Sequence, residues 1–208
     1  MKLGIDISYH NGLIDWQAVK NAGVEFIIAR CGYGPKVKWE CTLDETFFTN
    51  VEQAHKHSLN VGTYFYSYAL TPDEARDEGK WVKDLITNSG ISLEHFIGFD
   101  IEDADNFKRN NNFNFSKEYM TEICQAFLNE MKPLDCGIYT SLSWLDDYID
   151  WKKLNCAVWS AQWVDSYKAN NYSLEQLHQY NQLPTYMWQF TDSFKIGNKL
   201  FDANILYI

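Results

Sequence analysis

The chain has 208 residues, of which 46% are hydrophobic and 22% charged, as in an ordinary globular protein of one α/β domain. Its formal net charge of −10 and its lack of clustered lysine and arginine argue against a nucleic-acid partner, and no apolar run is long enough to span a membrane. Aromatic residues reach 16%, which suits either a tryptophan-rich core or a groove lined by rings.

The five cysteines form an odd set without a C-x-x-C pair, which argues against a zinc site and against a dense disulfide scaffold. Cys124 and Cys136 lie in apolar segments and are expected to be small core residues. Cys31 and Cys41 could form a disulfide if the loop between them folds back, and the sequence leaves this open.

The first part of the chain alternates strands with helices. Residues 3–8 alternate apolar and polar side chains, and residues 26–31 and 61–66 are also expected to be strands. Asp15 is placed to cap a short helix that Gly23 ends, and apolar spacing predicts a second helix over roughly 45–57.

The middle of the chain carries the clearest helix signals. Thr71 can cap a helix with Pro72 in its first turn and Glu74 closing a capping box, and the helix is expected to reach about residue 86. The next strand ends at Phe99-Asp100-Ile101-Glu102, and residues 103–114 read as a polar loop at the rim of a site. Ser116 then caps a helix with strong apolar periodicity.

Four more strands are expected in the last third, over 136–140, 157–161, 186–190 and 200–204. No helix separates the last two, so that end is expected to be antiparallel. Strands alternating with helices predict a mainly parallel sheet covered by helices, and nearly eight strands favour a barrel with a degenerate second half. An open doubly wound sheet is the alternative, although G-x-G-x-x-G and P-loop motifs are absent.

The segment Phe99-Asp100-Ile101-Glu102 is the most informative in the chain. Side chains alternate faces along a strand, so Asp100 and Glu102 point the same way, with Cα atoms roughly 6.6 Å apart. Two carboxylates that face a shared space repel each other, which can separate their pKa values and leave one acid and one base. A solvated strand end is the plainer interpretation of this segment taken alone.

Other strands end in polar side chains as well. In a barrel of parallel strands, the functional groups gather at the carboxyl ends of the strands, so these residues are expected to meet at one mouth. The strand-end polar residues are Asp6, Ser8, Arg30, Tyr64, Tyr66, Asp100, Glu102, Gln162, Gln189, Asp202 and Asn204.

In their order along the chain, these motifs resemble glycoside hydrolase family 25, the N-acetylmuramidase type of lysozyme found in phage endolysins, bacteria and some fungi. The motifs are Gly4-Ile5-Asp6-Ile7-Ser8 with Asn11-Gly12, Ile28-Ala29-Arg30 with Gly32-Tyr33-Gly34, Gly62-Thr63-Tyr64, Phe99-Asp100-Ile101-Glu102, Met187-Trp188-Gln189 and Asp202-Ala203-Asn204. The resemblance runs from about residue 3 to the last residues. It implies a modified TIM-like (β/α)5β3 barrel as one catalytic domain over 1–208. Many phage members of the family carry a second, wall-binding domain, and none is expected in this chain, which departs from them in this respect.

The resemblance also implies an activity, hydrolysis of the β-1,4 bond between N-acetylmuramic acid and N-acetylglucosamine in peptidoglycan with retained configuration and without metal or organic cofactor. Glu102 matches the family's general acid and Asp100 its partner carboxylate. Asp6 and Asp202 match supporting acids, and Tyr64 matches a substrate-contacting tyrosine. Hydrolysis of this kind needs a protonated carboxyl at the leaving oxygen, and three nearby acids would raise the pKa of Glu102.

Two features of the mechanism stay open at this stage. Asp100 acts either as a direct nucleophile or by orienting the 2-acetamido group of the substrate, and the resemblance leans toward the second. Side-chain separations of about 5 Å and about 6.5–9.5 Å distinguish retaining from inverting pairs, and a Cα distance does not decide between them.

Sugar contacts are expected from aromatic and polar residues around this mouth. The stacking candidates are Tyr33, Tyr64, Tyr66, Trp159 and Trp188, with Trp159 equally suited to the core, and the polar candidates are Arg30, Gln162 and Gln189. The alternatives to a muramidase are a spent glycan-binding module and a hydrolase of another N-acetylated polymer such as chitin.

The expected partner is bacterial cell-wall peptidoglycan, acted on by a monomer that binds neither nucleic acid nor membrane. The chain enters a strand at its first residues without a signal peptide. Action on the wall would therefore follow cell lysis from a cytoplasmic pool, a non-standard export route or removal of a leader.

Overall fold

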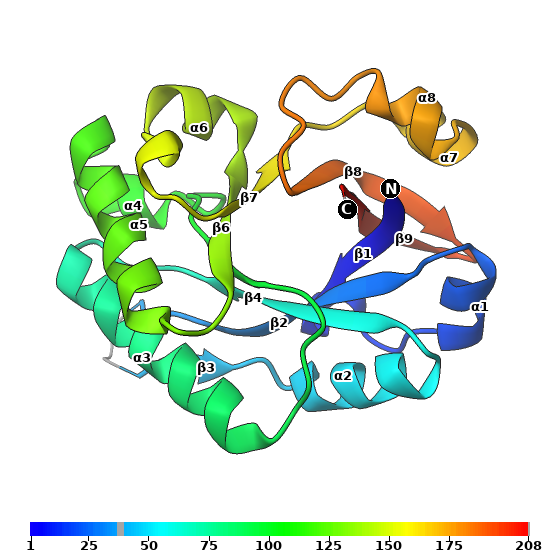
Figure 1. Ribbon diagram of the computed structural model, residues 1–208, viewed down its shortest axis with the longest axis horizontal. Helices are drawn as coiled ribbons and strands as arrows, with labels where there is room; N and C mark the ends of the chain where they lie inside the picture. Colours follow the sequence, from blue (N-terminus) through cyan, green and yellow to red (C-terminus); the bar gives the residue numbers. More distant parts are fainter. Residues whose placement is uncertain (37–39, 208) are drawn as a thin grey trace.

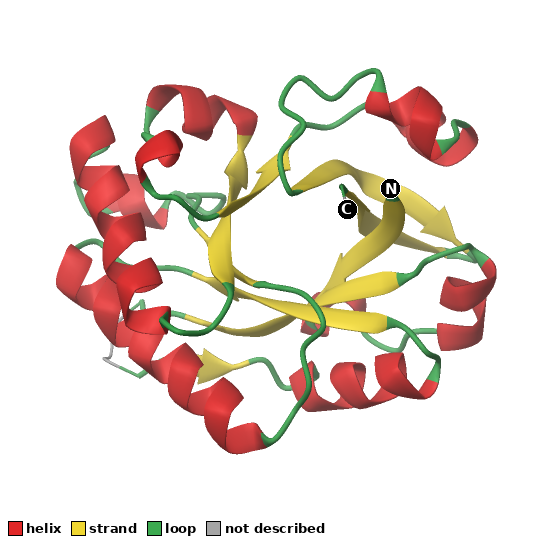
Figure 2. Ribbon diagram, viewed as in Figure 1, coloured by secondary structure: helices red, strands yellow, loops and turns green. Residues whose placement is uncertain are grey.

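The computed structural model describes residues 1–36 and 40–207 and forms a closed β-barrel wrapped by helices (Figures 1 and 2). One sheet has the strand order β1-β9-β8-β7-β6-β5-β4-β2-β3, and β1 also pairs with β2, so eight strands close the barrel and β3 lies outside it. The strands are β1 (Lys2–Ile7), β2 (Phe26–Tyr33), β3 (Thr42–Leu43), β4 (Asn60–Tyr66), β5 (Ile97–Asp100), β6 (Cys136–Ser141), β7 (Ala157–Ala161), β8 (Met187–Ile196) and β9 (Lys199–Leu206).

Helices follow most of the strands and cover the outside of the barrel (Figure 2). They are α1 (Trp16–Asn21), α2 (Phe47–Lys56), α3 (Pro72–Ser89), α4 (Phe107–Asn110), α5 (Lys117–Met131), α6 (Leu142–Asp147), α7 (Ser166–Asn171) and α8 (Leu174–His178), with 3₁₀ turns η1 (Tyr9–Asn11) and η2 (Trp151–Lys153). The capping box of Thr71 and Glu74 at the start of α3 is present, as predicted. Residues predicted as one polar loop include the short helix α4.

Every pairing between barrel strands is parallel except the two that involve β9, which is antiparallel to both β8 and β1. This confirms the predicted modified TIM-like α/β barrel with an antiparallel end, and the open-sheet alternative is wrong. Because the parallel strands share one direction, their carboxyl ends meet at the same end of the barrel.

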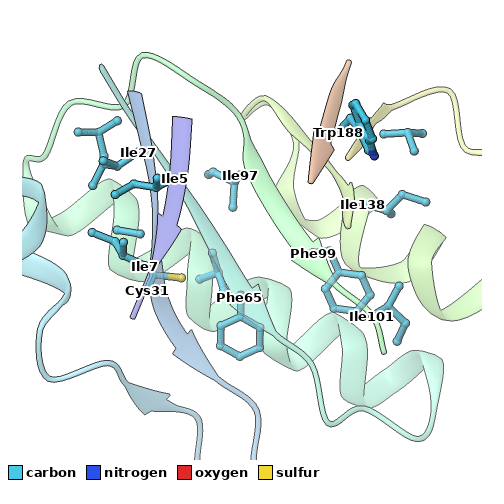
Figure 3. Close-up of a cluster of buried hydrophobic side chains, with 14 of the residues drawn as sticks. Ile5, Ile7, Ile27, Cys31, Phe65, Ile97, Phe99, Ile101, Ile138 and Trp188 are labelled. Atoms are coloured by element: carbon cyan, nitrogen blue, oxygen red, sulfur yellow. The ribbon is translucent and has the colours of Figure 1, made fainter. Parts of the chain in front are cut away.

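The larger core lies between the barrel and the helices. Outward-facing strand residues such as Ile5, Ile27 and Phe99 are fully buried there, and several of them are labelled in Figure 3. The ring of Phe127 on α5 stacks on Phe99 with a centroid distance of 4.0 Å. This layer fixes the rotation of each strand, and so decides which side chains point into the barrel.

A second, smaller core fills the interior of the barrel. Its buried members are Phe26, Ile28, Phe96, Tyr139, Trp159, Met187 and Leu206. At Gly4 an added Cβ would lie 2.2 Å from the ring of Phe26, so glycine is required for this ring to enter the barrel. Below the polar mouth, the barrel is therefore a packed interior and not a channel.

All five cysteines, each within the described residues, are free thiols. Cys31 is fully buried in the outer core, and the possible disulfide with Cys41 is not formed. Of the helices in residues 1–36 and 40–207, none has the length and apolar content needed to cross a membrane.

Candidate active site

A cavity of about 330 Å³ opens at the carboxyl ends of the barrel strands and collects four acidic side chains. Asp6 comes from β1, Asp100 from β5, Glu102 from the segment after β5, and Asp202 from β9. The other lining residues are Ile7, Ser8, His10, Asn11, Arg30, Tyr64, Tyr66, Tyr139, Trp159 and Gln189. The acids predicted from distant parts of the chain therefore share one cavity.

Asp6 is held by a network of amide groups. Its Oδ2 accepts hydrogen bonds from Nε2 of Gln189 at 3.0 Å and from Nδ2 of Asn204 at 2.8 Å. The antiparallel pairing of β1 with β9 sets Asp6 directly opposite Asp202. Burial raises the pKa of Asp6, and it raises the pKa of Asp202 to about 8 with a further contribution from the charge of Asp6.

Asp100 and Glu102 come from β5 and the segment after it, which β4 and β2 separate from β1 and Asp6. Between this pair of acids, Ile101 packs into the outer core, and its carbonyl accepts a hydrogen bond from Thr140 Oγ1 at 2.7 Å. Burial raises the pKa of Asp100 well above its ordinary value and raises the pKa of Glu102 to about 7. Of the three acids expected to raise the pKa of Glu102, Asp6 does so, together with Asp103 and Asp105, but burial is the larger cause.

Lys108 is a functional candidate that the sequence analysis missed. Its side chain is buried, and Nζ donates to the backbone carbonyls of Ser67 at 2.6 Å and Glu102 at 3.0 Å. Asp103 accepts hydrogen bonds from the backbone N–H groups of Lys108 and Arg109, which holds α4 against the site. The positive charge lowers the pKa of both Asp100 and Glu102. No local pattern distinguishes this lysine from an exposed one in a polar segment.

Several predicted contact residues line the cavity. Tyr64 and Tyr66 do so from β4, and Tyr64 meets Trp159 edge to face with ring centroids 6.0 Å apart. Arg30 is buried, and its Nε donates to Asp44 Oδ2 at 2.9 Å. Trp159 belongs to the inner core and also forms part of the cavity wall, so its core role is confirmed and its contact with a sugar stays a prediction.

Three predicted contact residues lie elsewhere. Trp188 is fully buried in the outer core because it alternates with the inward-facing Met187 and Gln189, so a stacking role for it is wrong. Gln162 is outside the cavity lining, and its side chain accepts a hydrogen bond from the backbone of Gln182. Tyr33 follows an irregularity in β2 and lines a separate surface pocket.

Two groups that the sequence did not indicate bond to Gln189 in the cavity wall. Tyr139 lines the cavity, and Trp163 lies outside its lining. Tyr139 OH donates to Gln189 Oε1 at 2.9 Å, and Trp163 Nε1 donates to the same oxygen at 3.0 Å. The alternation along 157–163, which puts odd-numbered residues inside the barrel, could have identified Trp163. Within the described residues, no cluster of histidine, cysteine and acidic side chains is arranged to hold a metal ion.

Comparison with known proteins adds independent observations. The family model for "Glycosyl hydrolases family 25" matches residues 5–198. Lysozyme M1 of Streptomyces globisporus is 29% identical over 100 residues, which cover 44% of this chain and 32% of that lysozyme.

Two solved structures show the shared fold. The modular autolysin LytC from Streptococcus pneumoniae, determined in complex with a synthetic peptidoglycan ligand, superposes with a TM-score of 0.78 at 22% identity, over 99% of this chain and 46% of that one. The bacterial lysozyme from Streptomyces coelicolor gives a TM-score of 0.67 at 19% identity, over 100% of this chain and 92% of that one. This chain thus matches less than half of LytC and about a third of Lysozyme M1. Because the family model covers most of the sequence, the chain belongs to glycosyl hydrolases family 25.

Proposed function

We propose that this chain hydrolyses the β-1,4 bond between N-acetylmuramic acid and N-acetylglucosamine in bacterial peptidoglycan, with Glu102 as the general acid. One observation carries the proposal: Glu102 and Asp100 share the wall of one buried cavity at the mouth of the barrel. Burial raises the pKa of Glu102 to about 7, so its carboxyl keeps a proton near neutral pH and can give it to the glycosidic oxygen.

Asp100 is suited to assist the substrate's own acetamido group. Asp100 lines the cavity together with Glu102, and its carboxylate is proposed to accept the N–H of a 2-acetamido group of the bound sugar. The acetamido oxygen would then attack the anomeric carbon as Glu102 protonates the leaving oxygen. Water, deprotonated by the Glu102 carboxylate, would attack the same carbon from the other face, which retains the configuration. Direct attack by Asp100 also gives retention.

Asp6 and Asp202 are proposed as supporting acids rather than as the proton donor. Asp6 accepts hydrogen bonds from Gln189 and Asn204, which fix it in the wall of the cavity that Glu102 and Asp100 also line. Its charge raises the pKa of Glu102. Tyr64, Tyr66, Arg30 and Gln189 line the remaining wall and are proposed to contact the sugar in the cavity.

The test is digestion of purified peptidoglycan, followed by borohydride reduction and mass spectrometry. Wild type is expected to give products that end in muramitol. Glu102→Gln is expected to fold and to lose about 10²–10⁴-fold in turnover, because it lacks the transferable proton. Glu122→Gln, an exposed isosteric change on α5, is the matched control and is expected to turn over like wild type.

Three results would contradict parts of the proposal. Products that end in glucosaminitol would show that the other bond is cut. Full turnover by Glu102→Gln would remove Glu102 from the role of acid. Binding to the wall without new reducing ends in wild type would favour a glycan-binding module.

A further inference from the structure

Trp163 lies between β7 and α7 and is 56% exposed. The backbone on both sides of it is fixed to β8, because the N–H of Gln162 donates to the carbonyl of Gln189 at 3.1 Å and that of Val164 to the carbonyl of Phe190 at 2.8 Å. Side chains alternate along an extended chain, so Trp163 follows Trp159 on the inward face. Its Nε1 bonds to Gln189, which lines the cavity, so the indole lies beside the mouth of the barrel although Trp163 is not among the lining residues.

The edge of this indole is bonded to the active-site wall. Nε1 donates to Oε1 of Gln189 at 3.0 Å, and Nε2 of the same glutamine donates to Asp6 Oδ2 at 3.0 Å. Gln189 itself is only 2% exposed, so the ring is attached to a buried and fully engaged partner. Trp163 therefore combines an open face with a fixed orientation, and a fixed ring loses little conformational freedom when a ligand covers it.

The size of the cavity implies that a polymer also contacts its rim. A cavity of about 330 Å³ has room for one N-acetylhexosamine and not for a longer strand, so the neighbouring sugars must lie outside it. A pyranose presents a face of C–H groups, which is complementary to the electron-rich face of an indole, while its polar substituents stay at the ring edge. Trp163 has its exposed surface beside the Asp6 and Gln189 wall, where such a neighbour would lie.

We propose that Trp163 is the stacking platform for a sugar next to the one in the cavity, and so determines specificity for a glycan strand over a single sugar. This inference rests on the proposed function, since it names a second contact of the same substrate. Trp163 is assigned to binding and does not touch the reacting atoms.

The experiment measures binding by calorimetry in the Glu102→Gln background, with a tetrasaccharide of alternating N-acetylglucosamine and N-acetylmuramic acid. Trp163→Ala is expected to weaken binding about tenfold, whereas Trp163→Phe, which keeps a ring and loses the N–H, is expected to stay within about threefold. The matched control is Tyr167→Ala, because Tyr167 on α7 is a 69% exposed aromatic outside the cavity lining, and its loss is expected to have no effect.

Steady-state kinetics of the active enzyme, which keeps Glu102, give a second readout. Trp163→Ala is expected to raise KM about tenfold with kcat within about threefold, because stacking binds ground state and transition state alike. If the alanine variant does not fold, Trp163→Leu makes the same comparison, since it keeps apolar bulk without a ring.

The outcomes separate this inference from the proposed function. The proposed role of Trp163 would be overturned if Trp163→Ala bound the tetrasaccharide as tightly as Tyr167→Ala does. It would also be overturned if Trp163→Phe lost as much affinity as Trp163→Ala. In both cases wild type would still cleave peptidoglycan. If wild type released no reducing ends and Glu102→Gln bound no tetrasaccharide, the proposed function would fail, and the platform with it.

Discussion

Lys108 places a positive charge beneath the acidic wall of the cavity. Nζ bonds to the backbone carbonyls of Ser67 and Glu102, and Glu78, also buried, accepts a hydrogen bond from Ser67 Oγ at 2.6 Å. Burial lowers the pKa of Lys108, and the surrounding carboxyl groups oppose that shift. The lysine therefore offsets repulsion between Asp100 and Glu102 while it holds the backbone that carries Glu102.

Replacement of Lys108 by methionine tests this role. Both limbs of the pH profile of kcat/KM are expected to move to higher pH, because the cation lowers the pKa of Asp100 and of Glu102 in the wild type. Loss of the bond to the Glu102 carbonyl is expected to reduce activity by up to about 100-fold through misplacement of the acid.

The matched control for Lys108→Met is Arg109→Met, which removes the adjacent but exposed cation. Its pH profile is expected to coincide with that of wild type. If Lys108→Met lowers kcat/KM at every pH but leaves the two apparent pKa values of the profile unchanged, Lys108 acts on structure alone.

At the scale of elements, alternation along each strand separates the core from the site. On β1, Ile5 and Ile7 pack outward, while Gly4 and Asp6 face the interior. Gly4 lies below Asp6 and is in contact with Phe26, which belongs to the interior core. One strand thus supports the packing of both layers and presents an acid at the mouth.

Gly4→Ala tests the packing of the barrel interior. The added Cβ would lie 2.2 Å from the Phe26 ring, so β1 or the ring must move. The free energy of unfolding, measured with urea, is expected to fall by about 1–3 kcal/mol, as for other overpacked cores. Gly98→Ala on β5 is the control, because its Cβ would meet its nearest neighbour, Trp159, at 3.4 Å. Equal stability of the two variants would contradict the assigned role of Gly4.

At the scale of the whole molecule, the buried acids of the site destabilise the folded state when they are ionised. Burial raises the pKa of Asp6, Asp100, Glu102 and Asp202, as well as that of Glu78, which it raises to about 7. A carboxyl whose pKa is raised by folding binds its proton more tightly in the folded state. Its contribution to stability is complete below the unfolded pKa and is lost as the pH rises through the folded pKa.

The free energy of unfolding is therefore expected to fall as the pH rises from 5 to 8. The window follows from Glu102, whose pKa rises from 4.5 to about 7, and Asp202, whose pKa rises from 3.8 to about 8. The expected decrease is at least ~1 kcal/mol, since one pKa unit corresponds to about 1.4 kcal/mol. Urea titrations at pH 5, 6.5 and 8 measure it.

The Glu102→Gln/Asp202→Asn double variant is the comparison for this prediction. It is expected to show a weaker dependence on pH and to be more stable than wild type at pH 8, because two buried charges are absent. A wild-type free energy of unfolding that increases from pH 5 to pH 8 would contradict the prediction.

Local patterns in the sequence determined the order and type of the barrel strands and of the helices α1, α2, α3 and α5. Alternation marked the strands, the Thr71 capping box marked the start of α3, and the Asp100–Glu102 spacing put both acids on one face. These features depend on periods of about two and 3.6 residues, which nearest neighbours in the chain establish. The order of the motifs along the sequence was enough to identify the family, which the comparisons confirm.

Only the tertiary structure decided which side chains are buried, which are hydrogen-bonded and which are exposed. Trp188 lies at the start of β8 and Trp163 just after the end of β7, yet Trp188 is buried in the outer core and Trp163 is exposed beside the mouth. Lys108 is buried because Ser67 and Glu102, distant from each other in the chain, offer it their carbonyls. Burial and charge depend on neighbours that the closure of the barrel brings together, and local sequence does not contain that information.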